Sequence, residues 1–132
     1  MELNFTLKEL CYSDIARQCK INNQPVTIEQ YQNLMELIFY VLQPLRNRLG
    51  KPVIITSGFR CPLVNSKVGG ANNSQHLTGC AADIKVNGCS TNTLFEYIRG
   101  SGIPYDQLIN EHDEWVHVSF RKGHNRHQSF RL

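Results

Sequence analysis

Apolar residues recur every three or four positions between Ile28 and Leu49, which predicts one amphipathic helix over that segment. Thr27 followed by Gln30 resembles a capping box, so we expect the helix to begin there. Pro44 lies inside the pattern and should kink the last turn, because it removes a backbone hydrogen bond and crowds the preceding turn. The stripe expected to face the core consists of Ile28, Tyr31, Leu34, Met35, Ile38, Val41, Leu42, Leu45 and Leu49.

Short β-branched or alternating runs after that helix predict four strands. They are a buried strand at residues 53–56, a second strand at 82–86, and two more at 105–110 and 115–120 around a tight polar turn. The polar stretch at residues 60–78 is expected to form a loop, and so long a loop in a compact domain is typically functional. A short helix is expected at residues 91–99. This order predicts an α+β fold, with a small antiparallel sheet and helices packed on one face.

Length and composition indicate one ordinary globular domain. The chain has 132 residues, of which 41% are hydrophobic and 19% are charged, with 9 Gly and 5 Pro. A chain of this length can fold without a disulfide or a metal, so a metal site here needs a chemical reason. We expect a single monomeric domain over residues 1–132.

The charge balance and hydropathy narrow the range of partners. The 14 Lys and Arg exceed the 11 Asp and Glu by only three charges, too few to indicate a nucleic-acid partner. Part of the excess lies in a C-terminal tail that we expect to be solvated, with contact to an anionic polymer as the alternative; its cations are Arg121, Lys122, Arg126 and Arg131. No stretch approaches the ~20 apolar residues of a membrane span, and the first ten residues lack the apolar run of a signal peptide. We therefore expect cytoplasmic synthesis and no membrane contact, with release by another agent if the substrate lies outside.

The cysteines form an odd set of five without any C-x-x-C pair: Cys11, Cys19, Cys61, Cys80 and Cys89. Reduced thiols are the simpler interpretation for a chain made in a cytosol. For Cys61 and Cys80, which adjoin the motifs described below, packing is expected rather than metal or redox work.

Strand alternation singles out residues for chemistry. In the strand at residues 115–120 the valines and the phenylalanine form the core face, so His117 projects from the opposite face. The strand at residues 82–86 likewise directs Asp83 away from the core, and His76 stands seven positions before it. Two imidazoles and one carboxylate suit zinc, whose catalytic sites take three protein ligands and leave a fourth position for water. A histidine on a strand is more often structural than a metal ligand. The spacing of His76 and Asp83 alone is therefore weak evidence for a metal site.

Three motifs resemble those of a known enzyme family. Residues 74–83, SQHLTGCAAD, resemble the S-x-H-x-x-G-x-A-x-D signature of the zinc D-alanyl-D-alanine carboxypeptidase and L,D-endopeptidase family, peptidase family M15. Residues 114–117, EWVH, match its E-x-x-H motif, and residues 55–60 resemble its strand and turn ending in an arginine. The likeness is greatest to compact single-domain members of phages and prophages, and it runs in order over nearly the whole chain. It implies the fold shared by Hedgehog and DD-peptidase domains.

The resemblance also implies a zinc site and a general base. The family's zinc ligands fall on His76, Asp83 and His117, and its base falls on Glu114. Zinc lowers the pKa of a bound water from about 15.7 to about 7 and polarises the scissile carbonyl. Glu114 is then expected to take the proton and to pass it to the leaving amine.

Further residues take supporting roles in this expectation. Arg60 is expected to neutralise a developing oxyanion or to clamp a substrate carboxylate, with a purely structural arginine as the alternative. Ser74 and Trp115 are expected to contact the substrate. His112, five positions before the last ligand, is an alternative base, whereas Glu111 is expected to anchor the turn.

These expectations converge on a zinc metallopeptidase that hydrolyses peptidoglycan stem peptides at bonds involving D-amino acids. Either a carboxypeptidase or an L,D-endopeptidase fits, and so does a phage endolysin that is released to degrade the cell wall. A non-catalytic zinc module that binds the cell wall or belongs to a phage particle is the alternative, because the Hedgehog domain keeps such a zinc site without peptidase function. A cytoplasmic dipeptidase is a third possibility.

Overall fold

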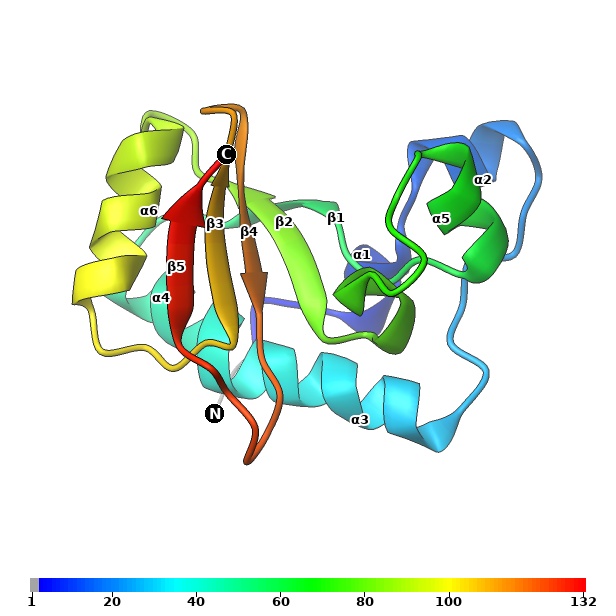
Figure 1. Cartoon of the computed structure of the whole chain (residues 1–132), viewed down its shortest axis with the longest axis horizontal. Coiled ribbons are helices and arrows are strands. Elements are labelled where there is room, and N and C mark those ends of the chain that lie inside the picture. Colours follow the sequence, from blue (N-terminus) through cyan, green and yellow to red (C-terminus); the bar gives the residue numbers. More distant parts are fainter. Residues whose placement is uncertain (1–2) are drawn as a thin grey trace.

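A computed structural model describes residues 3–132, shown in Figure 1. The expectation that no signal peptide is present rests partly on Met1 and Glu2, and these two residues lie outside the described range. Over residues 3–132, none of the helices combines the length and the apolar character that crossing a membrane requires.

Five strands form one sheet in the order β1-β2-β4-β3-β5 (Figure 1). They are β1 (Ile54–Ser57), β2 (Ala81–Lys85), β3 (Gln107–Glu111), β4 (Trp115–Ser119) and β5 (Gln128–Arg131). The first four pair antiparallel as predicted, whereas β5 runs parallel to β3. β4 is therefore the central strand, with β2 on one side and β3 on the other.

Helices complete the α+β fold, and the predicted class is confirmed. They are α1 (Leu7–Cys11), α2 (Asp14–Gln18), α3 (Ile28–Leu37), α4 (Gln43–Leu49), α5 (Pro62–Lys67) and α6 (Thr91–Gly100). A π-helical stretch, η1 (Ile38–Leu42), joins α3 to α4, and a 3₁₀ turn, η2 (Gln75–Thr78), precedes β2. The core helices α3, α4 and α6 pack against the sheet, while α2 and α5 lie against each other beside the β1 edge (Figure 1).

The long predicted helix forms as α3, η1 and α4 in succession. Its capping box is confirmed, because the Thr27 hydroxyl accepts from the Gln30 N–H while the Gln30 amide oxygen accepts from the Thr27 N–H. Just ahead of Pro44 the helix widens into η1, where the Gln43 N–H donates to the carbonyl of Ile38. Proline crowds the turn that precedes it, so we attribute this widening to Pro44.

The core lies between the sheet and the helices. All six residues predicted to face inward from the second and fourth strands are buried: Ala82, Ile84, Val86, Val116, Val118 and Phe120. Within the helix stripe Leu49 is half-buried, Ile28, Tyr31 and Met35 are exposed, and the other five residues are buried. The prediction was wrong for the three exposed residues, of which Ile28 and Tyr31 belong to the first turns of α3, which extend past the strands (Figure 1).

Two other local predictions were wrong. β1 is not a buried strand, because it pairs only with β2 at the sheet edge and leaves Ile54 38% exposed. The polar stretch at residues 60–78 is not one loop, because Pro62 occupies the first position of α5, where its missing N–H costs nothing, and Ser74 caps η2.

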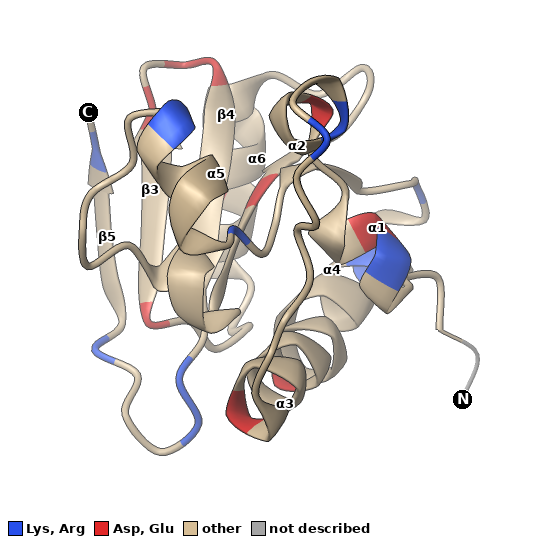
Figure 2. Cartoon of the chain, turned by 90° about the vertical axis from the view of Figure 1, so that its right-hand side faces the viewer, with Lys and Arg blue, Asp and Glu red and all other residues tan. Residues whose placement is uncertain are grey.

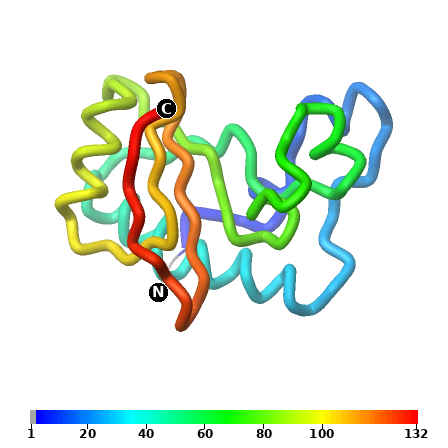
Figure 3. The backbone as a smooth tube through the Cα atoms, viewed as in Figure 1, coloured from blue at the N-terminus to red at the C-terminus, as the bar shows by residue number. Residues whose placement is uncertain are grey.

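The C-terminal tail is ordered as β5, which the sequence pattern did not predict. The strand is short and exposed on both faces, so period-two alternation has no apolar face to reveal. The tail is exposed as expected, but Arg126 pairs with Asp106 at 2.9 Å and Arg131 pairs with Glu96. Figure 3 shows this last segment alongside β3, and Figure 2 shows cationic residues along the connection between β4 and β5.

All five cysteines lie within the described residues, and each is a free thiol there. Cys80 is buried, and burial raises the pKa of its thiol. The thiolate, which is the form that binds metals and reacts, is therefore disfavoured at Cys80.

Candidate metal centre

His76, Asp83 and His117 converge from three separate elements, η2, β2 and β4. Asp83 and His117 are direct partners in the β2–β4 register, so their side chains leave the sheet on the same face. His76 Nε2 lies 3.2 Å and His117 Nδ1 lies 3.1 Å from Asp83 Oδ1. All three residues are buried, and their donor atoms lie within 4.8 Å of one another.

The donor set and its spacing fit a single zinc ion. Zinc binds imidazole nitrogen and carboxylate oxygen at about 2.0–2.2 Å, so two ligands of a tetrahedral ion lie about 3.3 Å apart. The contacts of 3.1 and 3.2 Å around Asp83 Oδ1 are close to that separation. Two nitrogens and one oxygen suit zinc better than calcium or magnesium, which prefer oxygen ligands alone.

Neighbouring groups hold the candidate ligands in place. His76 Nδ1 lies 2.7 Å from the carbonyl oxygen of Gly58, so the tautomer that donates there leaves Nε2 free for a metal. The second carboxylate oxygen of Asp83 accepts from Arg60 Nη2 at 3.3 Å. Such partners fix the orientation of metal ligands in known sites.

Asp83 carries the negative charge of the centre. Burial is the largest single effect on its pKa and acts to raise it. Hydrogen bonds from His117 and His76, together with the charge of those imidazoles, outweigh burial and hold the pKa of Asp83 below its ordinary value. The carboxylate is therefore in the ionised form that coordinates a cation.

Arg60 is fixed beside the centre by three polar groups. Its Nε donates to Ser57 Oγ at 3.0 Å, and its two Nη atoms donate to Asn65 Oδ1 and Asp83 Oδ2, each at 3.3 Å. Burial lowers the pKa of Arg60, and the charges of Asp83 and Glu111 act in the opposite direction. The structure thus brings Arg60 to the three candidate ligands, as the sequence predicts.

A cavity of about 560 Å³ opens over the three candidate ligands, and we call it the ligand cavity. Its walls include Arg60, Ser74 and Trp115, the three residues expected to meet a substrate. Ser74 Oγ also accepts from the His76 N–H at 3.2 Å, so it shapes the turn that carries a ligand. Trp115 Nε1 is buried with no hydrogen-bond partner among residues 3–132, so the cavity is bordered by other atoms of this side chain.

The expected bases lie at the hairpin between β3 and β4. Residues 112–114 form a three-residue connection in which His112 and Asp113 have positive φ, and the side chains of Asn110 and Asp113 hydrogen bond around the turn. His112 is exposed at the tip and is not brought into the ligand cavity. Asp113 therefore stabilises the turn.

The two glutamates of the hairpin are placed differently. Glu111, expected only to anchor the turn, lines the ligand cavity. Glu114 does not line it, but lies on an adjoining cavity that also reaches Arg60 and Asp83. The E-x-x-H spacing singled out Glu114 in the sequence. Glu111 reaches the ligand cavity because β3 pairs with β4, and no short sequence motif indicates that pairing.

The cavity wall contains two further residues that sequence reasoning missed. Gln75 and Arg126 line it, and both contact Asp106: Gln75 Nε2 lies 2.7 Å from Oδ2, and Arg126 Nε lies 2.9 Å from Oδ1. Gln75 immediately precedes the candidate ligand His76, so this contact could have been suspected only from the position of Gln75 in the motif.

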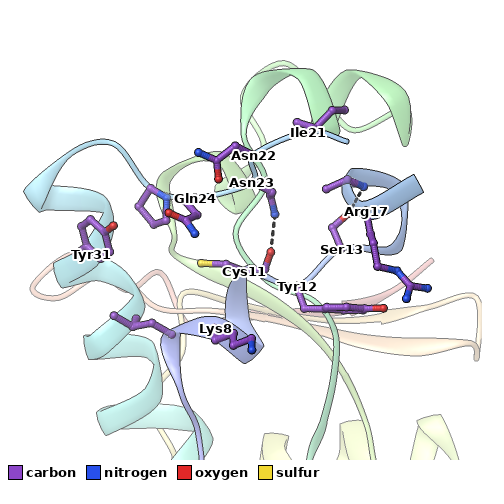
Figure 4. Close-up of a pocket in the computed structure, with 13 residues that line it drawn as sticks. Lys8, Cys11, Tyr12, Ser13, Arg17, Ile21, Asn22, Asn23, Gln24 and Tyr31 are labelled. Atoms are coloured by element: carbon purple, nitrogen blue, oxygen red, sulfur yellow. Dashed lines mark hydrogen bonds between the residues drawn. The ribbon is translucent and has the colours of Figure 1, made fainter. Parts of the chain in front are cut away.

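A second cavity, also about 560 Å³, lies among α1, α2 and the chain that leads to α3 (Figure 4). Lys8, Tyr12 and Arg17 are among its walls, and the Asn23 side chain donates to the carbonyl of Cys11 at 2.9 Å. No candidate metal ligand lines this cavity. The donor chemistry, and not the volume, therefore identifies the functional site.

Three buried nitrogen and oxygen donors under an open cavity define a mononuclear metal centre with room for a fourth ligand, the arrangement of catalytic sites. An α+β domain around such a centre has the organisation of a metallohydrolase. The family model described as Peptidase M15 matches residues 5–119. The zinc D-Ala-D-Ala carboxypeptidase of Streptomyces albus G is 36% identical over 87 residues, which cover 62% of this chain. The chain belongs to peptidase family M15.

The match with the Streptomyces protein is partial for both chains. It covers 33% of that relative, so this chain spans about a third of the length of the curated relative that it matches. The family match contains all three candidate ligands and ends at the last residue of β4.

Proposed function

We propose that this domain is a zinc-dependent peptidase that hydrolyses peptidoglycan stem peptides at bonds involving D-amino acids. The proposal is carried by the buried His76, Asp83 and His117 donors under the ligand cavity, in a chain of family M15. The name of the Streptomyces relative, a zinc D-Ala-D-Ala carboxypeptidase, supports both the metal and the substrate class. Either carboxypeptidase or endopeptidase action is compatible with an open cavity.

In this proposal the two histidines and Asp83 hold the zinc ion. A bound zinc ion would lower the pKa of water to about 7 and polarise the scissile carbonyl. Arg60 presents its guanidinium to the same cavity, where it stabilises the negative charge that develops on the carbonyl oxygen or binds a carboxylate of the substrate. Ser74 and Trp115 border the same cavity, where they contact the peptide.

Peptide hydrolysis also needs a group that moves a proton. A carboxylate takes a proton from the attacking water as the new C–O bond forms. It gives the proton to the amide nitrogen as the C–N bond breaks, so the products are a carboxylate and an amine. The E-x-x-H spacing favours Glu114 for this task, and Glu111 is the other glutamate of the same hairpin.

Product identification on defined stem peptides tests the proposed function. The purified domain with one equivalent of zinc should cleave a single bond, and a chelator should abolish the cleavage. Mass spectrometry distinguishes the modes, because a carboxypeptidase releases one terminal D-alanine and an endopeptidase releases two peptides. Binding to intact sacculi without cleavage by the zinc-loaded domain would contradict a peptidase and support the cell-wall-binding module.

We further propose that residues 1–132 act as one monomeric domain that degrades the cell wall, as a phage endolysin does. One core cluster joins α1, α3, α4 and α6 to the central strands β2, β4 and β3, which supports a single unit. Addition of the domain to permeabilised bacteria should lower their turbidity in a zinc-dependent manner, and gel filtration should give the mass of a monomer. Cleavage of free dipeptides without attack on sacculi would favour a dipeptidase.

A further inference from the structure

We propose that Glu111, and not Glu114, is the catalytic carboxylate that exchanges the proton with the attacking water. This inference rests on the proposed function, since it names the base of that reaction. Three observations carry it: the strand register, the cavity walls and the rigidity of the hairpin.

The strand register places Glu111 on the face of the sheet that holds the metal centre. Glu111 is the direct partner of Trp115 across β3 and β4, and Ile109 is the partner of His117. Directly paired residues of antiparallel strands point to the same face, and alternate residues of one strand do so as well. Glu111, Trp115 and His117 therefore share a face, and Asp83 joins them through the β2–β4 pairing.

The E-x-x-H spacing does not place Glu114 on that face of the sheet. Glu114 lies in the turn that precedes β4, so the period-two rule that aligns Glu111 with His117 does not extend to it. Its side chain is exposed and also borders a cavity beside the start of α6. The spacing between Glu114 and His117 therefore gives no reason to place the two side chains on one face.

The cavity walls give the same assignment. The ligand cavity is lined by all three metal donors and by Glu111. The cavity that Glu114 shares with Arg60 and Asp83 contains neither histidine. A water molecule positioned by the three donors is thus in a space that the Glu111 side chain borders.

The rigidity of the hairpin suits a base at Glu111. The Glu111 carbonyl accepts from the Glu114 N–H at 2.9 Å, and the pair Asn110 and Asp113 closes the turn. Glu111 thus sits at the end of a paired strand, where its backbone is fixed, and its carboxylate has no hydrogen bond or ion pair within residues 3–132 to give up.

Two single substitutions test the assignment, E111Q and E114Q, because each removes one negative charge from the same hairpin with little change in shape. We expect E111Q to bind zinc as tightly as the unsubstituted protein and to lower kcat on a stem peptide by about 10²–10⁴-fold, with KM changed less than threefold. E111D should restore part of kcat, since it returns a carboxylate. E114Q should retain kcat within about twofold.

A binding measurement gives a readout that does not depend on turnover. Acetohydroxamic acid chelates zinc and donates a hydrogen bond to a carboxylate beside the metal. By calorimetry its affinity for the zinc-loaded E111Q protein should fall about tenfold, as for the loss of a charge-assisted hydrogen bond, and it should be unchanged in E114Q.

The outcomes separate the two proposals. If E114Q loses turnover and hydroxamate affinity while E111Q keeps both, Glu111 is not the base. If the unsubstituted, zinc-loaded protein cleaves no stem peptide, the proposed function fails, and the hydroxamate comparison still decides which glutamate faces the metal. Loss of zinc binding in E111Q would assign Glu111 to the ligand set and would overturn its role as base.

Discussion

Gly58 and His76 connect the N-terminal part of the sheet to the metal centre, since His76 Nδ1 lies 2.7 Å from the carbonyl oxygen of Gly58. The same segment is held from two sides: the Phe59 N–H donates to the carbonyl of Leu10, and the Arg60 N–H donates to the carbonyl of His76. A Cβ on Gly58 would overlap the Leu10 carbonyl oxygen far inside van der Waals contact. The orientation of a candidate ligand therefore depends on a residue without a side chain.

Gly58→Ala should destabilise the protein and weaken metal binding together. The new methyl group can be accommodated only if the backbone shifts, at a cost of about 1–3 kcal/mol, and the shift moves the carbonyl that orients His76. We expect zinc affinity to fall by about 10–100-fold. Chemical denaturation and a competitive zinc titration measure the two effects.

Gly100→Ala is the matched control for that substitution. Gly100 ends α6, and a Cβ there would meet nothing within 4 Å. Alanine should therefore leave zinc affinity unchanged and should stabilise the helix by up to about 1 kcal/mol. Equal losses of zinc affinity in both variants would show that His76 does not depend on Gly58.

Asp106 should make the stability of the protein sensitive to acid. Hydrogen bonds from Arg126 are the main reason that the pKa of this buried carboxyl falls from 3.8 to about 2, and Gln75 adds another. Because the folded-state pKa is lowered, the stabilisation is fully present above about pH 4 and is lost as the pH falls toward 2. It amounts to about 1–2 kcal/mol, since Arg126 is 46% exposed and water weakens the pair.

Denaturation of Asp106→Asn from pH 2 to 7 tests this dependence. The variant should be less stable than the unsubstituted protein at pH 7, and the difference should shrink below pH 4. Asp14→Asn removes an exposed carboxylate that lies 3.9 Å from Arg17, so its effect should stay below about 1 kcal/mol. A difference for Asp106→Asn that stays constant down to pH 2 would contradict the depressed pKa.

The sequence predicts the features that depend on local periodicity. The alternation in β2 and β4 identified the buried aliphatic face and, on the other face, Asp83 and His117, which the register indeed makes direct partners. His76 was a candidate only from its spacing to Asp83, and the resemblance gave the same three ligands. The class of fold and the capping box at Thr27 were likewise predictable, because each follows from residues close together in sequence.

The features that the sequence does not predict depend on pairing between distant segments. β5 has no apolar face and is held by its parallel register with β3 and by the contact of Arg126 with Asp106. Glu111 was assigned to the turn because its position relative to His117 depends on how β3 pairs with β4. Pro44 was predicted to kink the last turn of the long helix, and the π-helical widening at η1 just ahead of it was not predicted.

Arg60→Lys should impair turnover although it keeps the positive charge. The guanidinium reaches Ser57, Asn65 and Asp83 with three different nitrogens, and a single ammonium cannot reproduce that geometry. We expect kcat/KM on a stem peptide to fall by about 10–100-fold, with the zinc content unchanged. Steady-state kinetics and metal analysis check this, with Arg99→Lys as a control, because Arg99 is exposed and pairs only with Glu96. Full activity of Arg60→Lys would mean that Arg60 has only a structural role.

Removal of the metal should abolish activity without unfolding the domain. The buried cluster that holds the sheet to α3, α4 and α6 contains none of the candidate ligands His76, Asp83 and His117. In the metal-free state the anionic Asp83 retains its hydrogen-bonded contacts with both histidines and with Arg60, so no uncompensated charge is left buried. We therefore expect the far-ultraviolet circular dichroism of the chelated protein to match that of the zinc-loaded protein.

Thermal unfolding of the zinc-loaded and the chelated protein tests this prediction quantitatively. Zinc binds the folded state, so the loaded protein should unfold at a higher temperature, by an amount that grows with the free zinc concentration. The chelated protein should still unfold in one cooperative transition, because its core is intact. A chelated chain that shows no transition would mean that the ion is needed for folding, as in a zinc finger, and the centre would then be structural. A cooperative transition together with lost turnover, restored by added zinc, is the result that a catalytic centre requires.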